Sequence, residues 1–274
     1  MMLSLLLGRD KRDPLTPNFN FFGTAFTRAK DSIFLDIMKL RYEVYCNECH
    51  FLNAQDYPDG CESDTYDAKA HHVAARNDAG QVIGTVRLVF AEEGEQFPFE
   101  EHCEVFPDFF FPPRTECAEV SRLVVRKTYR RRPGDTLQGI SKEFREKGRV
   151  DIVVPEVNDP KGKHRRHISP QILLGMFREI YRYSRKNGKR YWFAAMEKGL
   201  VRSLGKMGFR FVQTGPQTDY YGPVATYFAD LDQLEVDVRN ANEFLARWFN
   251  DEPITLWLAL KTWVHFKFIS RGKS

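Results

Sequence analysis

The short run Val120–Val125 constrains the fold of this chain more than any other segment. It is apolar, rich in β-branched residues and only a few residues long, which is typical of a strand that is covered on both faces. A strand of this kind belongs at the centre of a sheet, with helices packed above and below it. We therefore expect the rest of the chain to supply flanking strands and two layers of helices.

Periodicity and turn residues predict these further elements. Apolar residues at helical spacing predict helices over residues 31–45, 169–188 and 197–207. Runs rich in β-branched and aromatic residues predict strands over 72–76, 82–90, 190–196, 209–214 and 225–231, and Asn77–Gly80 offers hairpin-turn residues between the first two. This order predicts an α/β (α+β) fold with a central mixed, twisted sheet and helices on both faces.

Three segments lack such regularity. Residues 97–113 are aromatic and proline-rich, and we expect a packed irregular connection there, whereas the charged, proline-broken residues 126–167 predict an exposed excursion. Residues 242–274 are rich in Trp, Phe and Leu with interleaved Lys and Arg. Because 256–260 are apolar all round, we favour a helix packed on the domain, with contact to a membrane surface or a partner as the alternative. We expect a main domain over 1–235 and a C-terminal helical extension over 236–274.

Composition indicates a cytoplasmic protein without a metal. No run of about 18 apolar residues is present, the apolar start is too short for a signal sequence, and five cysteines fit a reducing compartment. Cys46–His50 matches the haem-attachment pattern C-x-x-C-H, but it continues an amphipathic helical pattern, so we expect ordinary buried or half-buried thiols. The adjacent His71 and His72 point to opposite faces of a strand and make a poor metal pair.

Charged residues stand inside or beside the apolar runs, where an unpaired charge is costly. Three arginines and three carboxylates could balance one another as a buried ion network, which either braces the sheet or forms part of a substrate site. Carboxylates near a cleft could hold a substrate ammonium group, and one could act as a general base. These six residues are Arg41, Asp64, Asp67, Arg87, Glu119 and Arg122.

The same residues carry a resemblance to a known superfamily. Their order along the chain is Arg41, Tyr45, Phe51, Asp64-x-Tyr66-Asp67, Arg87-Leu88, Phe106-Pro107 and Glu119-x-Ser121-Arg122. Over residues 30 to 230 this pattern resembles the acyl-homoserine lactone synthases and their relatives, which include the N-acyl amino acid synthases and the acyltransferases associated with PEP-CTERM/exosortase systems. The long basic excursion and Tyr220–Pro223 look more like the latter two groups.

The resemblance implies a GNAT-type fold and a donor bound as a thioester. The acyl-phosphopantetheine arm of acyl carrier protein would lie where the strands at 120–125 and 190–196 splay apart, with no permanently bound cofactor and no metal. Glu119, Ser121 and Arg122 would be catalytic, Glu119 as general base with a pKa raised by apolar neighbours, and backbone N–H groups of the central strand would bind the oxyanion. Substrate-binding residues would be Arg41, Tyr45, Phe51, Asp64, Tyr66, Asp67, Arg87 and Phe106, with Arg41 or Arg87 meeting the acceptor's carboxylate.

The leading prediction is transfer of a long fatty acyl group from acyl carrier protein to the amine of an amino acid. One alternative is a lactone synthase that uses S-adenosylmethionine, although Phe51 stands where those enzymes usually have tryptophan. Another is a module that binds acyl chains or acyl carrier protein without turnover.

Two basic runs predict where an acidic carrier protein docks. A solvated face is the alternative, and nucleic acid is disfavoured because no recognition motif accompanies the charges. The runs are Arg126, Lys127, Arg130, Arg131 and Arg132, and Lys161, Lys163, Arg165 and Arg166.

Overall fold

The computed structural model describes residues 13–25, 32–129 and 169–262. One mixed sheet runs through this part of the chain in the order β1-β2-β3-β4-β5-β8-β6, and β7 pairs with β8 off this path. The strands are β1 (Phe19–Ala25), β2 (Ala70–Asn77), β3 (Val82–Val89), β4 (Cys117–Val125), β5 (Tyr191–Met196), β6 (Val212–Gln213), β7 (Thr218–Asp219) and β8 (Pro223–Asp230).

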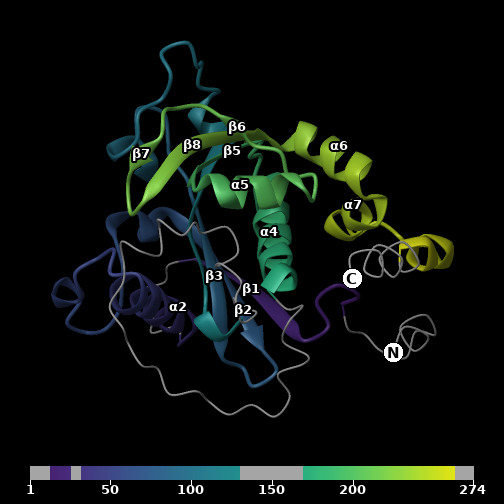
Figure 1. Cartoon of the computed structure of the whole chain (residues 1–274), viewed down its shortest axis with the longest axis horizontal. Coiled ribbons are helices and arrows are strands. Elements are labelled where there is room, and N and C mark those ends of the chain that lie inside the picture. Colours follow the sequence, from purple (N-terminus) through teal and green to yellow (C-terminus); the bar gives the residue numbers. More distant parts are fainter. Residues whose placement is uncertain (1–12, 26–31, 130–168, 263–274) are drawn as a thin grey trace, which may run out of the picture.

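Helices cover both faces of the sheet, as the apolar pattern predicted (Figure 1). The α-helices are α2 (Ser32–Tyr42), α4 (Ser169–Lys186), α5 (Lys198–Gly205), α6 (Leu231–Ala241) and α7 (Glu243–Phe249). A π-helix, η1 (Glu43–Glu48), continues α2, and the 3-10 helices are η2 (Ala54–Asp56), η3 (Thr65–Lys69), η4 (Pro98–Glu101), η5 (Arg114–Glu116) and η6 (Lys127–Tyr129).

Alternation along β2 assigns the two faces. Ala74 packs with α2 in one apolar cluster, whereas Val73 and Ala75 belong to the main core under α4. The main core also holds Trp192 of β5, whose indole N–H donates to the buried Ser184 hydroxyl of α4 at 2.9 Å. Helix α4 can lie close to β1 because residue 175 is glycine: a Cβ there would stand 2.0 Å from the ring of Phe21.

The structure confirms most of the predicted elements and corrects several. Strand β1 has no counterpart in the prediction, because its apolar residues do not alternate cleanly between two faces. The predicted strand 209–214 shrinks to β6, because the chain after α5 turns at Gly208 with a positive φ and commits Phe209 to the core. The predicted helix 31–45 is α-helical only to Tyr42, where the π-helix begins.

The predicted C-terminal helix is replaced by two shorter helical segments. Helix α7 contributes Leu245, Trp248 and Phe249 to the main core. The prediction that 256–260 pack on the domain is wrong for Leu256, Trp257 and Leu260, which are exposed. A separate helical segment covers 256–262, and 263–274 lie outside the described residues. The expected domain boundary after residue 235 falls within α6, whose Leu234 and Val238 are both core residues.

Among the described residues, no helix combines the length and apolar character needed to cross a membrane. In the same part of the chain, no group of three or more His, Cys, Asp and Glu residues is arranged to hold a metal ion. Cys46 is buried and Cys49 half-buried in the π-helix region, and neither forms a disulfide.

Candidate active site

The sheet is joined at its centre by a short parallel seam between β4 and β5. Pairing starts at Cys117↔Tyr191 and stops at Glu119↔Phe193, although β4 continues to Val125. Beyond the seam β4 pairs with β3 but not with β5, so its backbone groups on the β5 side are not used by that strand. The predicted separation of the two strands therefore begins at Glu119.

A bulge follows at once on β4. The residues from Ser121 to Val124 oppose those from Arg87 to Thr85, so β4 carries one extra residue. Arg122 lies in this bulge with a φ of 51°, in the left-handed region that side chains other than glycine rarely adopt. The bulge directs the Arg122 side chain toward the carboxylates of Glu62 and Asp64.

Arginines and carboxylates form a closed ring beside the bulge. Each arginine contacts two carboxylates and each carboxylate contacts two arginines, so the six formal charges alternate and cancel. Five of the six nitrogen–oxygen contacts measure 2.5 to 3.1 Å, and the sixth joins Arg41 to Glu62. In order around the ring the members are Arg41, Glu62, Arg122, Asp64, Arg87 and Asp67, which returns to Arg41.

Local structure orients the two aspartates of the D-x-Y-D motif. Asp64 is the N-cap of η3 and accepts a hydrogen bond from the Tyr66 N–H at 3.0 Å, and Asp67 accepts the Asp64 N–H at 2.9 Å. This reciprocal capping box fixes both carboxylates and leaves oxygens for the arginines. Arg87 also donates from Nε to the Ser121 hydroxyl at 3.1 Å, which ties β3 to β4.

The ring is buried and stays charged. Burial alone would raise the pKa of Asp67, but Arg41 and Arg87 outweigh it and hold that pKa well below its ordinary value. Arg41 is fully buried and Arg87 is 1% exposed, whereas Arg122 is 12% exposed and is the outermost arginine. Among the described residues, Nη2 of Arg41 and Nη2 of Arg87 have no hydrogen-bond acceptor. The ring therefore keeps donors that a further acidic group could use.

His72 lies beneath the ring as a neutral imidazole. Its Nε2 is 3.3 Å from the Asp67 carbonyl oxygen, and Phe34 meets its ring edge to face. Burial lowers the pKa of His72 to about 4, so no fourth cation is added to the ring near neutral pH.

Glu119 stands outside the ring, although the sequence grouped it with the other five charges. It is buried, and its carboxylate accepts the Phe99 N–H at 3.0 Å. Burial raises the pKa of Glu119 to about 7, against the opposing effects of the Phe99 N–H, Arg87 and Arg122. A carboxyl group with a pKa near the pH of the cell can accept and return a proton, which a general base requires.

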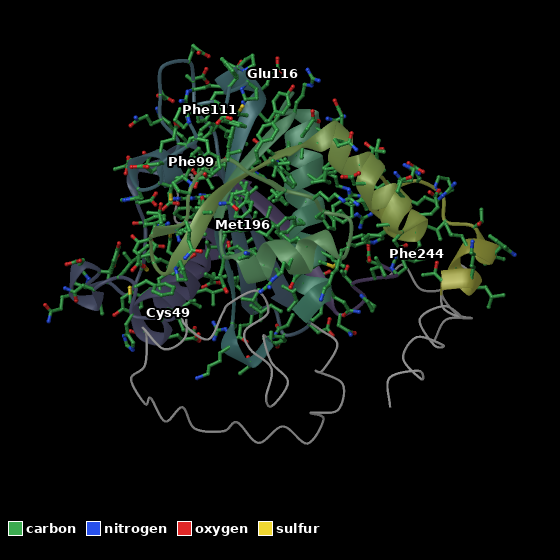
Figure 2. The ribbon with its side chains drawn as sticks, turned by 45° about the horizontal axis from the view of Figure 1, so that its top comes forward. Cys49, Phe99, Phe111, Glu116, Met196 and Phe244 are labelled. Atoms are coloured by element: carbon green, nitrogen blue, oxygen red, sulfur yellow. The ribbon has the colours of Figure 1, made fainter. Side chains whose placement is uncertain are left out.

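An aromatic cluster lies next to Glu119 on the side of β5. Phe193 pairs with Glu119 across the seam, and its ring packs against that of Phe99 at a centroid distance of 5.4 Å. Figure 2 shows Phe99 and Phe111 near one another, far from Cys49. The cluster is built from the irregular segment before β4 and from β5 and β8, and its rings are Phe97, Phe99, Phe109, Phe111, Phe193 and Phe228.

A second set of rings begins beside Arg122. Arg122 lies over the ring of Tyr45, with 5.5 Å between the guanidinium carbon and the ring centroid. From Tyr45 the rings continue to Phe51, then to Tyr221 and Tyr220 of the turn before β8. We call these four residues the aromatic rim. Burial raises the pKa of Tyr45 to about 12, so its hydroxyl stays protonated beside the arginine.

The other predicted residues lie less centrally. The Tyr66 hydroxyl donates to Glu101 of η4, and Phe106 is 39% exposed with its N–H bonded to the Thr214 carbonyl. Arg126 pairs with Glu43 at 3.1 Å and Lys127 is exposed, while the rest of the two basic runs, 130–132 and 161–166, lies outside the described residues.

Glu62 is the ring member that the sequence analysis missed. It is fully buried, binds both Arg41 and Arg122, and its N–H donates to the Met38 carbonyl of α2. It stands in a polar loop without apolar neighbours, so the signal used for the other charges was absent. Without Glu119, the predicted network holds three arginines but only two carboxylates. This excess of positive charge was the remaining sign of a missing acidic residue.

Part of the chain is similar to a known protein family. Residues 40–138, which include the ring, Glu119 and the bulge, match the family model described as Acetyltransferase (GNAT) domain. The chain has a GNAT fold. No curated protein matches it.

Solved structures extend the GNAT fold over most of the chain. The acyl-homoserine lactone synthase LasI is 15% identical, with 81% of this chain and 95% of LasI covered and a TM-score of 0.53. TofI in a ternary complex with an inhibitor and MTA is 15% identical, with 80% of this chain and 96% of TofI covered and a TM-score of 0.54. BjaI, a CoA-dependent acyl-homoserine lactone synthase whose structure holds SAM and isopentyl-CoA, is 15% identical, with 82% of this chain and 89% of BjaI covered and a TM-score of 0.51. At this identity the likeness concerns the fold.

Proposed function

We propose that the protein transfers a long-chain fatty acyl group from an acyl carrier protein thioester to the amine of an amino acid. The observation that carries this proposal is Glu119, a buried carboxyl group with a pKa near 7 at the point where β4 and β5 separate. The separation leaves backbone groups of β4 without a partner on β5, and an acyl-pantetheine arm can pair with them there.

The reaction needs one proton acceptor. An amino acid's amine is mostly protonated near neutral pH, and Glu119 takes a proton from it directly or through water. The freed nitrogen attacks the thioester carbonyl and a C–N bond forms. The nitrogen then loses a second proton, which passes to the sulfur as the C–S bond breaks and the thiol leaves, and Glu119 releases the proton it took first to water. The oxyanion of the tetrahedral intermediate binds to N–H groups of β4 beyond the seam.

The two sides of Glu119 suit the two substrates. The aromatic cluster offers an apolar surface for the acyl chain next to Glu119. On the other side the acceptor's carboxylate binds at the Arg87–Arg122 side of the ring, where Arg122 is partly exposed and Nη2 of Arg87 is unpaired among the described residues. Arg41 is fully buried and supports the ring from beneath.

The donor side is assigned to acyl carrier protein because basic residues follow β4. Lys127 is exposed directly after the strand, and Arg130, Arg131 and Arg132 continue the run in the sequence. An acidic carrier would be steered by these charges. We expect reversal of the three arginines to Glu, and added salt, to weaken turnover with carrier-bound donors but not with a short acyl-pantetheine. Equal loss with both donors would assign the arginines to the active site or the fold. Such a donor places the reaction in the cytoplasm.

Product mass spectrometry tests the proposal directly. The purified protein is incubated with acyl carrier thioesters and a panel of amino acids, with S-adenosylmethionine in a parallel set, and free thiol is measured. An acyl amino acid supports the proposal. An acyl lactone supports the alternative of a lactone synthase, which the shared fold with LasI and BjaI favours. Absence of thiol release with every acceptor and with acyl-CoA would indicate a binding module.

A further inference from the structure

The helical segment at 256–262 presents its apolar side to the solvent. Leu256, Trp257 and Leu260 are 61%, 68% and 55% exposed, while Leu258 and Ala259 are half-buried. In Figure 1 this segment is the short yellow helix at the edge of the molecule beyond α7. Large apolar residues on the outer side of a terminal helix mark a surface that another phase or molecule covers.

The pattern within the segment is that of one helical stripe. Positions 256, 257 and 260 lie on the same side of a helix, and Lys261 continues that side with its ammonium group 5.2 Å from the ring centroid of Trp257. Trp and Lys side chains share an apolar body and a polar tip. They therefore suit the boundary between the acyl chains and headgroups of a membrane.

Charge identifies the covering surface. From Pro253 to the end of the sequence there is no Asp or Glu, while Lys261, Lys267, Arg271 and Lys273 are present. The residues from 263 to 274 lie outside the described part, but their composition is again aromatic and basic. Basic charge combined with large apolar residues matches a lipid surface that carries negative headgroups.

We propose that the outward face of residues 256–262 holds the protein on an anionic membrane surface. Leu256, Trp257 and Leu260 enter the acyl–headgroup boundary, and Lys261 meets the headgroup phosphates. This binding does not depend on the proposed acyl transfer, because the segment contributes no residue to the ring or to the surroundings of Glu119.

Vesicle co-sedimentation with the full-length protein tests the proposal. The vesicles are phosphatidylcholine alone or phosphatidylcholine mixed with phosphatidylglycerol. We expect binding to the mixed vesicles, at least tenfold weaker binding after the double change Trp257→Glu and Leu260→Glu, and a smaller loss after Lys261→Glu. Val212→Glu is the matched control, because Val212 is 65% exposed on β6 and should bind as the wild type does.

Three outcomes would overturn the proposal. They are failure of the wild type to bind either vesicle, equal binding by the double variant, and equal loss in the Val212→Glu control. Light scattering tests whether a second copy of the protein covers this face instead. A wild-type dimer that becomes monomeric in the double variant, without vesicle binding, would assign the face to a second copy. Circular dichroism of each variant verifies that it is folded.

Discussion

The ring and Glu119 are neighbours at β4, and their buried carboxylates behave in opposite ways. Within the ring, Asp67 touches two arginines and its pKa is held low, so it is permanently charged. Glu119 has one backbone N–H and an aromatic neighbourhood, and its pKa rises to about 7. Direct contact with a guanidinium outweighs burial in the first case, and burial wins in the second.

This difference separates positioning from proton transfer. A carboxylate bound to two arginines cannot take up a proton at neutral pH, but it holds its neighbours in place. A carboxylate with a pKa near 7 can exchange a proton in every turnover. We therefore expect the same chemical change, Glu to Gln, to have different consequences at Glu62 and at Glu119.

The largest expected effect is on turnover. Glu119→Gln keeps the size of the side chain and an acceptor for the Phe99 N–H, but it removes the base. We expect kcat to fall roughly 10²- to 10⁴-fold, and the wild-type rate to decline as the pH falls below about 7. Thiol release in stopped assays measures both. Glu116→Gln, at a solvent-exposed pair with Arg190 just before β4, is the control and should retain activity. Activity near that of the wild type in Glu119→Gln would refute the assignment.

The second effect is on stability. Glu62→Gln weakens two contacts at once, so that three buried or half-buried arginines face only the two carboxylates of Asp64 and Asp67. Removal of one partner from a buried ion pair costs about 3–5 kcal/mol, and we expect a loss of this order in the free energy of unfolding. Urea denaturation measures it. A loss below about 1 kcal/mol would mean that the ring contributes little to stability.

The third effect has the opposite sign. The pKa of Glu119 is higher in the folded protein than its ordinary value of 4.5, so its contribution to stability falls as the pH rises from about 4.5 to 7. Glu119→Gln removes this penalty. The variant should be more stable than the wild type by up to about 3 kcal/mol at pH 8, with little difference at pH 4. Urea curves at both pH values test this, and a variant that is less stable at pH 8 contradicts the raised pKa.

The smallest effect concerns the more exposed edge of the ring. Asp64 is 24% exposed and binds Arg87 and Arg122, so water can replace part of its role. We expect Asp64→Asn to cost about 1 kcal/mol of stability and to raise the KM for the acceptor about tenfold, because Arg122 loses one of its anchors. Steady-state kinetics with the donor saturating decide this. An unchanged KM and kcat would remove Asp64 from the acceptor site.

Sequence patterns predicted the parts of the fold that bury regular apolar faces. The helix at 169–188 and the strands at 82–90 and 120–125 appear as α4, β3 and β4, because periodic burial leaves a periodic sequence. Strand β1 and the short β6 depend on what packs against them, such as the Phe21 ring over Gly175, and no local pattern records such contacts.

The sequence predicted most of the residues of the site, but not which of them contact one another. Charges beside apolar runs identified Arg41, Asp67 and Arg87, since burial makes pairing obligatory. That principle gives no partner list, and so it could not separate Glu119 from the ring or bring in Glu62 from a polar loop. The bulge at Arg122 depends on a positive φ, and no glycine or asparagine stands there to indicate it in the sequence.

The three-residue seam between β4 and β5 also has a consequence for how the molecule assembles. On one side of it, β1 to β4 pair antiparallel in chain order, and on the other β5 pairs with β8. Each half can form from contacts that are comparatively close in sequence. The seam joins residues 117–119 to 191–193, which are far apart in the sequence, and a contact of this kind carries a larger loop-closure entropy cost. Glu119 therefore acquires its surroundings only when the two half-sheets pair, and the proposed catalytic centre lies at the junction between them.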